Sequence, residues 1–343
     1  MAKVSLSIVV PVFSGEAYLE KLVQAVENFR LRSEELEAPF NVTELILVDD
    51  AARDGSPELI DTLAEKHAWI VALHLSRNFG QHAATVAGIL HSSGDWVATI
   101  DEDLQHPPGQ IFDLLERGVK ENADVVYALP SSRAVHGAAW RDWSSVGFKR
   151  LMEWLTGTPT LGLVNSFRLL RGPIARAASS VCSHNTYFDI ALTWFTERIA
   201  AVPMELRDLR FIEGKSSGYN LSRLGSHAKR MLFSSQLRFL SLGLLIGGLL
   251  FIASLFASVF VFFIWLFSPE MIDAQGWTSL VLLVCGSTGL LSLMLGLCLQ
   301  YLSTLVLKAH GRPTFFTVDR SADQKIAEWF SVSTEKLTEK GAA

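Results

Sequence analysis

Three carboxylates and a side-chain amide stand within five residues, at Asp101, Glu102, Asp103 and Gln105, directly after an apolar run that ends at Ile100. Asp101 and Asp103 are two residues apart, so a turn would aim both carboxylates at one ion. Hard oxygen ligands of this kind suit Mg²⁺ or Mn²⁺ held together with a substrate phosphate. An acidic surface loop that caps the next helix is the alternative interpretation, because short acidic motifs recur by chance.

Further polar residues follow other apolar runs. Asp49 and Asp50 come after the run at 43–48, and Arg77 with Asn78 comes after the run at 69–75. In an open α/β sheet, residues after strands gather in the crevice outside the carboxyl ends, where nucleotides bind. No Gly-x-Gly-x-x-Gly and no Gly-x-x-x-x-Gly-Lys-Ser/Thr occurs, which weighs against a dinucleotide-binding oxidoreductase and a P-loop NTPase. The sequence therefore favours a nucleotide site built from carboxylates and a metal.

Apolar, β-branched runs alternate with helical patterns along the first part of the chain. This alternation predicts an α/β fold with a mainly parallel, doubly wound sheet. The expected strands lie at 5–12, 43–48, 69–75, 96–100 and 124–129, and the expected helices at 17–30, from 56 to about 66, up to 91, and at 108–121. Every polar cluster named above would then lie at one edge of that sheet.

Two long uncharged runs, at 239–267 and 278–307, dominate the second part of the chain. Each exceeds the roughly 20 residues that a helix needs to cross a bilayer, and each contains Gly and Ser, as helices packed in membranes do. A buried hairpin in a soluble core is the alternative. Lys and Arg flank the two runs but are missing from the connecting loop at 268–277, so the positive-inside rule puts both termini in the cytoplasm. We expect a multi-pass protein of the plasma (inner) membrane.

The remaining segments complete the expected organisation. Residues 221–237 carry apolar side chains at helical spacing with cations on the other side, which predicts an interfacial helix or, alternatively, a domain-packing helix. The expected parts are an α/β domain at 1–220, the interfacial helix at 221–237, a transmembrane hairpin at 238–308 and a cytoplasmic tail at 309–343. The net charge of −5 argues against a nucleic-acid partner. The side chains of His82, His91 and His106 are expected at the surface or at helix ends.

Four ordered motifs carry a resemblance to a known family. They are Val10-Pro11-Val12-Phe13 with Glu16; Val48-Asp49-Asp50-x-x-x-Asp54-Gly55-Ser56; Leu75-Ser76-Arg77-Asn78-Phe79-Gly80; and Asp101-x-Asp103-Leu104-Gln105-x-Pro107-Pro108. Together they resemble family-2 glycosyltransferases of the GT-A fold (Rossmann-like), and more narrowly the polyprenyl-phosphate enzymes similar to dolichyl-phosphate-mannose synthases. The motifs that fit the membrane-bound bacterial branch of that family are Gly214-Lys215-Ser216-Ser217-x-Tyr219, the two apolar runs and Gly311-Arg312-Pro313.

The resemblance implies roles for individual residues. The implied donor pocket consists of Pro11, Phe13, Glu16, Asp50, Arg77 and Asp101. The implied ligands of Mg²⁺ or Mn²⁺ are Asp103 first, then Asp101 and Gln105. The implied acceptor-phosphate residues are Arg133, Arg141, Ser145, Arg210, Ser216 and Ser217, and the implied catalytic residues are Asp101, Asp103 and Arg210. Turn carboxylates at Asp49 and Asp50, a loop contact for Arg77, and solvated loop charges for the other arginines remain alternatives.

The expected reaction depends on the acceptor. A sugar hydroxyl needs a general base as it attacks, whereas a phosphate monoester is already largely dianionic at pH 7. The family therefore implies inverting transfer of a monosaccharide from a nucleotide-sugar, with UDP-glucose the first expectation, to polyprenyl (undecaprenyl) phosphate at the cytoplasmic face. A processive polysaccharide synthase would need a Gln-x-x-Arg-Trp signature and more spans, and a catalytically silent membrane scaffold would not need the Asp101 motif. A homo-oligomer is compatible with the glycine-bearing spans.

The chain departs from the family pattern at three places. Glu102 stands where members of the family usually have a small residue, Phe13-Ser14 replaces the commoner Tyr-Asn, and the loop at Gly214 is one residue longer. These differences bear on donor preference and on the geometry of the acceptor loop.

Overall fold

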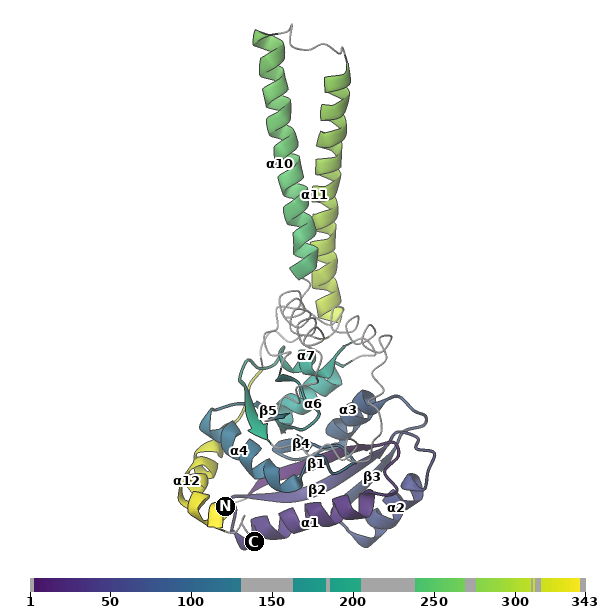
Figure 1. Cartoon of the computed structure of the whole chain (residues 1–343), viewed down its shortest axis with the longest axis vertical. Helices are drawn as coiled ribbons and strands as arrows, with labels where there is room; N and C mark the ends of the chain where they lie inside the picture. Colours follow the sequence, from purple (N-terminus) through teal and green to yellow (C-terminus); the bar gives the residue numbers. More distant parts are fainter. Residues whose placement is uncertain are drawn as a thin grey trace, which may run out of the picture.

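The computed structural model describes residues 3–130, 163–182, 186–204, 238–268, 276–309, 311 and 316–339. An α/β domain stands at one end of the molecule and a hairpin of two long helices at the other, as Figure 1 shows. The α/β fold class predicted from the alternating runs is confirmed. The predicted interfacial helix at 221–237 lies outside the described residues.

One mixed sheet of seven strands forms the middle layer of the domain. Its strands are β1 (Val4–Val12), β2 (Phe40–Asp49), β3 (Ile70–His74), β4 (Trp96–Thr99), β5 (Val125–Pro130), β6 (Arg168–Arg171) and β7 (Ile199–Met204). Their order is β3-β2-β1-β4-β6-β5-β7, and all neighbouring pairs are parallel except those of β6 with β4 and β5. The five expected strands are confirmed. The sequence pattern does not predict β6 or β7, because β6 has only four residues and Pro203 interrupts β7.

Helices cover both faces of the sheet. On one face lie α1 (Leu19–Glu35), α2 (Ser56–Lys66), α4 (Ile111–Lys120) and α12 (Asp323–Glu339), and on the other α3 (Gln81–His91), α6 (Gly172–Ser180) and α7 (Phe188–Leu192). A short 3₁₀ helix, η1 (Pro108–Gln110), leads into α4. The helices expected in the first part of the chain are confirmed with small shifts of their ends.

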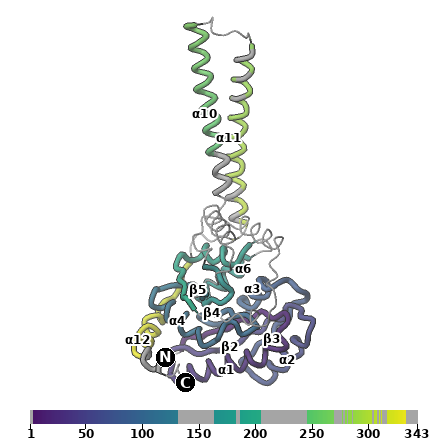
Figure 2. Tube along the Cα trace, viewed as in Figure 1, coloured from purple at the N-terminus to yellow at the C-terminus, as the bar shows by residue number. Residues whose placement is uncertain are grey.

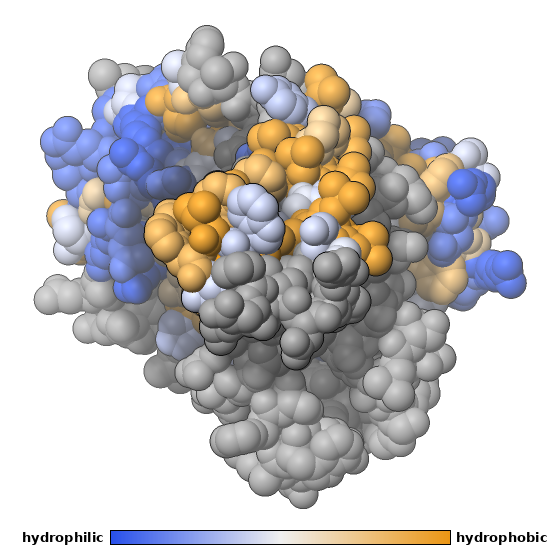
Figure 3. Space-filling view, turned by 90° about the horizontal axis from the view of Figure 1, so that it is seen from above, coloured by the Kyte–Doolittle hydropathy of each residue, from blue (hydrophilic) through white to orange (hydrophobic). Residues whose placement is uncertain are grey.

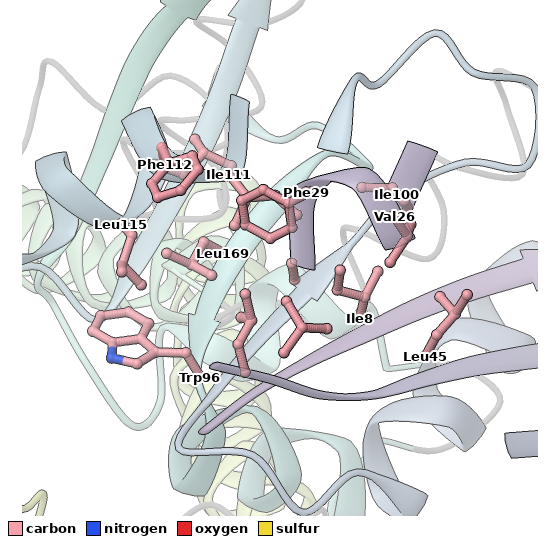
Figure 4. Close-up of a cluster of buried hydrophobic side chains, with 14 of the residues drawn as sticks. Ile8, Val26, Phe29, Leu45, Trp96, Ile100, Ile111, Phe112, Leu115 and Leu169 are labelled. Atoms are coloured by element: carbon pink, nitrogen blue, oxygen red, sulfur yellow. The ribbon is translucent and has the colours of Figure 1, made fainter. Parts of the chain in front are cut away.

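The alternation of side chains along β1 divides the core into two clusters. Ile8 and Val10 point to the face covered by α1 and α4, and Val9 points to the face covered by α3, as the period of two in a strand requires. Figure 4 shows the first cluster, in which side chains of the strands and of α1 and α4 meet. Within it, Phe29 and Phe112 pack edge to face with ring centroids 5.0 Å apart. Full burial of one such side chain stabilises the fold by about 2–3 kcal/mol.

The hairpin consists of α10 (Arg238–Phe267) and α11 (Trp277–Ala309). The most apolar parts of these helices, Leu245–Phe267 and Leu282–Leu302, are only 6% and 12% buried within the chain, which argues against a hairpin buried in a soluble core. By length and composition both can cross a membrane. Figure 3, seen from above, shows apolar side chains gathered in the middle of the view, with hydrophilic side chains to either side.

The two helices of the hairpin touch through glycines. A Cβ at Gly247 would lie 2.6 Å from the backbone carbon of Ser292, and a Cβ at Gly289 would lie 2.8 Å from the Cα of Phe251. Only glycine lets the two backbones approach this closely. The small residues of the apolar runs therefore have the packing role expected of them.

The last helix, α12, returns to the α/β domain after the hairpin (Figure 2). Ile326 and Phe330 on this helix are fully buried in the core cluster that α1 and α4 cover. Trp329 stacks on Phe112 of α4, with ring centroids 6.2 Å apart. Residues that the sequence pattern assigns to a separate tail thus form part of the outer layer of the domain.

Candidate active site

The loops that leave the carboxyl ends of β1 to β4 lie at one edge of the sheet. These strands are adjacent and parallel, with Val12 opposite Asp49 and Asp49 opposite His74. The residues that follow them, at 13–16, 50–55, 75–80 and 101–107, are therefore neighbours in space. The expected gathering of polar residues at this edge is confirmed by the hydrogen bonds described below.

Asp101 begins the turn after β4, and its carboxylate is held from two sides. The side-chain amide of Gln81 donates to Oδ1 at 2.6 Å, and the hydroxyl of Ser166 donates to Oδ2 at 2.8 Å. The backbone N–H of Asp101 donates to Nδ1 of His106 at 3.1 Å. The turn continues through Leu104, whose φ of 61° lies in the left-handed region. Such a conformation costs a non-glycine residue about 1–3 kcal/mol and concentrates at functional sites.

Asp103 is nearly buried in the same turn. Gln105 donates to its carboxylate twice, from the backbone N–H at 3.3 Å and from the side-chain amide at 2.9 Å. In the part of the chain that the structure describes, no group of three or more His, Cys, Asp or Glu side chains is placed to hold a metal. The donors of this turn nevertheless fit a divalent cation, because Mg²⁺ usually takes one or two carboxylates from a protein and its other ligands from substrate phosphates and water.

Asp50 is almost fully buried just after β2. Its carboxylate accepts the backbone N–H of Phe79 at 2.7 Å and that of Gly80 at 2.8 Å. Gly80 has a φ of 93°, which glycine adopts without strain. Asp50 therefore anchors the loop between β3 and α3. The predicted contact of Asp50 with the donor stays a prediction.

The turn from β1 into α1 has its backbone amides occupied by side chains of other loops. Four consecutive N–H groups donate in this way: Phe13 and Ser14 to Glu102 at 2.9 and 3.3 Å, Gly15 to Ser56 at 3.0 Å, and Glu16 to Asp54 at 3.3 Å. In proteins with a glycine-rich nucleotide loop, amides at this place hold phosphate. Because these amides are already engaged, a donor diphosphate here needs other partners, which agrees with the missing glycine motifs.

Exposed aromatic side chains flank these loops. Phe13 and Phe79 are each 49% exposed, and Phe13 directly follows the buried strand β1. The guanidinium of Arg77 lies 4.3 Å from the centroid of the Phe79 ring, a favourable cation–π contact. Arg77 thus makes the loop contact that was its alternative interpretation, and its predicted donor contact stays untested. Pro11 is buried within β1.

His106 is buried, so its expected place at the surface is wrong. Its ring stacks on Phe167 with centroids 5.0 Å apart, while Nδ1 accepts the N–H of Asp101. Burial lowers the pKa of His106, against the opposing effect of Asp101 and Asp103. The neutral imidazole therefore carries its proton on Nε2, and its contacts with the Asp101 N–H and the Phe167 ring hold the turn in place.

Sequence reasoning missed the side chains that hold Asp101. Ser166 is 65 residues away along the chain, so no local pattern relates it to Asp101. Gln81 directly follows the Arg77–Gly80 motif, and extending that motif by one residue would have included it. Beside it, His82 stacks on Tyr187 with ring centroids 5.5 Å apart.

A further buried carboxylate belongs to Asp189 of α7. It pairs with Arg168 and accepts the hydroxyl of Tyr127 at 2.7 Å. The guanidinium of Arg168 lies 4.7 Å from the centroid of the Phe188 ring. Burial, together with the charge of Asp189, raises the pKa of Tyr127. A carboxylate tied to an arginine and a tyrosine is a poor proton acceptor, so this geometry disfavours Asp189 as a general base.

The residues predicted for the acceptor phosphate lie outside the described ranges. They are Arg133, Arg141, Ser145, Arg210, Ser216 and Ser217. Their roles stay predictions.

Comparisons with known proteins show what the chain is similar to. Residues 7–176 match the family described as "Glycosyl transferase family 2". The chain is 31% identical over 311 residues to an undecaprenyl-phosphate 4-deoxy-4-formamido-L-arabinose transferase of Pseudomonas aeruginosa, which covers 90% of this chain and 88% of that protein. The enzyme of the same name from Salmonella choleraesuis is 28% identical over 90% of this chain and 91% of its own length.

Among solved structures, similarity extends to glucosyl-3-phosphoglycerate synthase from Mycobacterium tuberculosis in complex with Mn²⁺, UDP and phosphoglyceric acid, at 16% identity and a TM-score of 0.43 over 67% of this chain and 77% of that one. Mannosyl-3-phosphoglycerate synthase from Rubrobacter xylanophilus is similar at 14% identity and a TM-score of 0.45 over 67% of this chain and 71% of that one.

Proposed function

Because the chain belongs to glycosyl transferase family 2, we propose that this glycosyltransferase moves a monosaccharide from a nucleotide-sugar to undecaprenyl phosphate or a related polyprenyl phosphate. The observation that carries the proposal is the turn of Asp101 and Asp103 beside a β1–α1 turn whose amides are already engaged. Relatives named as undecaprenyl-phosphate 4-deoxy-4-formamido-L-arabinose transferases support the class of acceptor. UDP-glucose and a nucleotide-activated 4-deoxy-4-formamido-L-arabinose are the two donors to try first.

The donor would lie across the loops at the edge of the sheet. Its nucleoside would lie near Asp50 and Phe13, framed by Pro11 and Glu16, and its diphosphate near Arg77. Bound by Asp103 and Asp101, with Gln105, a Mg²⁺ or Mn²⁺ ion would act as a Lewis acid that neutralises charge on the diphosphate as it leaves. Hydrogen bonds fix the carboxylate oxygens that would bind the ion: Gln81 and Ser166 hold Asp101, and Gln105 holds Asp103.

The acceptor phosphate needs no general base. A phosphate monoester is largely dianionic at pH 7, so its oxygen can attack the sugar carbon directly. Each buried carboxylate described above already accepts hydrogen bonds, and Asp189 is also paired with Arg168. Direct attack would invert the sugar carbon without a covalent intermediate. We propose that Arg210 and the other predicted acceptor residues bind the phosphate and screen its repulsion from the donor.

The enzyme would work at the cytoplasmic face of the inner membrane. The hairpin of α10 and α11 is long and apolar enough to cross a bilayer twice. The packing of α12 on the α/β domain supports a hairpin whose two ends lie on the same side of that bilayer. The positive-inside rule makes that side the cytoplasm. The acceptor phosphate, at the surface of the cytoplasmic leaflet, would then face the loops of the site.

The proposal is tested with the full chain purified in detergent. The protein is mixed with undecaprenyl phosphate, a divalent cation and one of a panel of radiolabelled nucleotide-sugars, and lipid-linked sugar is separated by chromatography. We expect product from at least one donor, loss of product with EDTA, and a loss of about 100-fold in Asp103→Ala, because metal assistance supplies several kcal/mol to the transition state.

Other results would support different functions. A long polymer would favour a processive synthase, and absence of transfer from every donor would favour a catalytically silent scaffold. Undiminished transfer by Asp103→Ala would contradict the proposed metal site even if the reaction itself occurred.

A further inference from the structure

We propose that Glu102 is a positioning residue for the donor: it holds the β1–α1 turn in the shape that presents Phe13 to the nucleotide. This inference rests on the proposed function for its substrate, a nucleoside diphosphate sugar. Nothing in the proposed transfer reaction requires a third carboxylate beside Asp101 and Asp103. Its role therefore has to come from its contacts.

The contacts of Glu102 are with backbone rather than with another charged side chain among the described residues. Its Oε2 accepts the N–H of Phe13 at 2.9 Å and that of Ser14 at 3.3 Å, and Oε1 lies 3.4 Å from the N–H of Ser14. A Cβ at Gly15 would come within 3.0 Å of Oε2, so the carboxylate lies tightly against the turn. One side chain thus ties the loop after β4 to the loop after β1.

The opposite side of the same turn is held independently. Ser56 and Asp54 accept the N–H groups of Gly15 and Glu16, and Glu16 accepts the N–H of Gly55 at 3.0 Å. Removal of Glu102 would therefore release only the first half of the turn. Two N–H groups would lose a charged acceptor, and each such hydrogen bond is stronger than a neutral one.

The half that would be released carries Phe13. Its side chain is 49% exposed, so its position depends on the backbone of the turn more than on packing around the ring. A mobile turn would have to be ordered each time a nucleotide binds, and that ordering weakens affinity. Chemistry at the sugar carbon would be little affected, because the Asp101 carboxylate is held by Gln81 and Ser166 and not by Glu102.

The test compares Glu102→Ala and Glu102→Gln with a matched control, Glu44→Ala. Glu44 also binds backbone and hydroxyl donors, the N–H of Ser93 and the hydroxyl of Ser7, each at 2.6 Å, and it belongs to β2 well before the strand end that forms the site. Three measurements are made on the full chain in detergent. The first is hydrogen–deuterium exchange of the amides at 13–16 without ligand, the second is the Kd of UDP and of GDP with Mn²⁺, and the third is the kcat and KM of sugar transfer.

We expect Glu102→Ala to exchange the amides of Phe13 and Ser14 at least about tenfold faster, with Gly15 and Glu16 less affected. The Kd of the nucleotide that binds, and the KM of the donor sugar nucleotide, should rise about tenfold while kcat falls less than about threefold. Glu102→Gln keeps one amide oxygen as acceptor, so its amide exchange and its nucleotide Kd should lie close to those of the wild type. Glu44→Ala should leave the amide exchange at 13–16, the nucleotide Kd and the kinetic constants of transfer unchanged.

Unchanged exchange at 13–14 in Glu102→Ala would overturn the proposal, and so would an unchanged Kd or an equal fall in kcat and kcat/KM. If neither UDP nor GDP binds the wild type, the exchange measurement alone decides. If the wild type transfers no sugar at all but Glu102→Ala still weakens nucleotide binding, the proposed function fails and the positioning role stands.

Discussion

The acidic residues at the strand edge and those on the flank of the domain have different partners. At the edge, Asp50, Asp101 and Glu102 accept hydrogen bonds from backbone amides, a glutamine and a serine. On the flank, Asp124 and Asp323 bind arginines in the layer that holds α12. The same residue type is therefore held in place by neutral donors in one region and neutralised by cations in the other.

This difference has a physical consequence for ligand binding. A carboxylate held only by neutral donors has no cation beside it to cancel its field, and several such groups at one edge attract a metal cation. A carboxylate paired with arginine contributes little field, and removal of one member of a buried pair is strongly destabilising because the other charge loses its partner. The edge is thus arranged for binding and the flank for structure.

The largest effect is expected from breaking the flank. Asp124 accepts Arg171 Nε at 2.9 Å, Arg320 Nη2 at 2.5 Å and the hydroxyl of Thr196 at 2.7 Å. Asp124→Ala should lower the free energy of unfolding by about 3–5 kcal/mol, because it removes the buried carboxylate that Arg171 and Arg320 share and leaves Asp323 alone to balance both charges. The measurement is thermal unfolding of the detergent-purified protein. Glu116→Ala, which removes a surface pair with Lys120, is the control and should cost less than about 1 kcal/mol.

If Asp124→Ala lowered the free energy of unfolding as little as Glu116→Ala does, the stability of the flank would not depend on its charge pairs. The proposed difference between the edge and the flank would then be wrong.

The second effect concerns the docking of α12 on the same flank. The side chain of Phe330 on α12 is fully buried, although this helix begins more than ten residues after the hairpin ends. Phe330→Ala should lower the free energy of unfolding by about 3 kcal/mol, the lower end of the range for a buried phenylalanine. The exposed Val332 on the same helix is the matched control, and Val332→Ala should be nearly neutral. Equal stability of the two variants would mean that α12 is not part of the folded domain in solution.

The third prediction tests the edge. Asp103→Asn keeps the size of the side chain but removes its charge. We therefore expect a free energy of unfolding within about 1 kcal/mol of wild type and a rate of sugar transfer lowered about 100-fold. The assay pairs thermal unfolding with initial rates at saturating donor. Asp113→Asn, which changes an exposed carboxylate in the first turn of α4, is the control and should keep full activity. A variant that unfolds as readily as Asp124→Ala would show that Asp103 is a structural residue.

The sequence predicted the sheet and the edge for physical reasons that act locally. Five strands follow from apolar β-branched runs, and the polar clusters after them could be assigned to one edge because parallel neighbours end together. Asp103 and Gln105 lie two residues apart, so their contact is within reach of pattern reasoning.

The contacts that could not be predicted join residues far apart in the chain. Glu102 meets Phe13 across 89 residues, and Arg171 meets Asp323 across 152. No periodicity carries such information, because these contacts depend on how the strands are ordered and on where α12 returns. Ile326 and Phe330 lie in the segment expected as a cytoplasmic tail, and no local pattern indicates that they are buried in the core.

The smallest effect is expected at Asp49, the last residue of β2, whose carboxylate meets a histidine. Asp49 Oδ2 lies 3.0 Å from His74 Nδ1, and the other ring nitrogen lies 3.1 Å from Asp61. The hydrogen bond to Asp49, opposed by desolvation and aided by Asp61, raises the pKa of His74 above 6.5. The stabilisation is therefore fully present below about pH 6.5 and is lost as pH rises through the higher folded-state pKa. Because the ring is 37% exposed, it should amount to less than about 1 kcal/mol.

Replacing His74 should remove that dependence on pH. We expect thermal unfolding of wild type and His74→Gln to differ most near pH 6 and to converge as pH rises, because the neutral ring and the amide then offer similar hydrogen bonds. His91→Gln is the matched control, since the His91 ring contacts the carbonyl of Ala87 at 2.8 Å. A gap between wild type and His74→Gln that widens with rising pH would mean that the ring is neutral when it binds Asp49. In that case Asp49 would resemble Asp50 and Asp101, which are held by neutral donors.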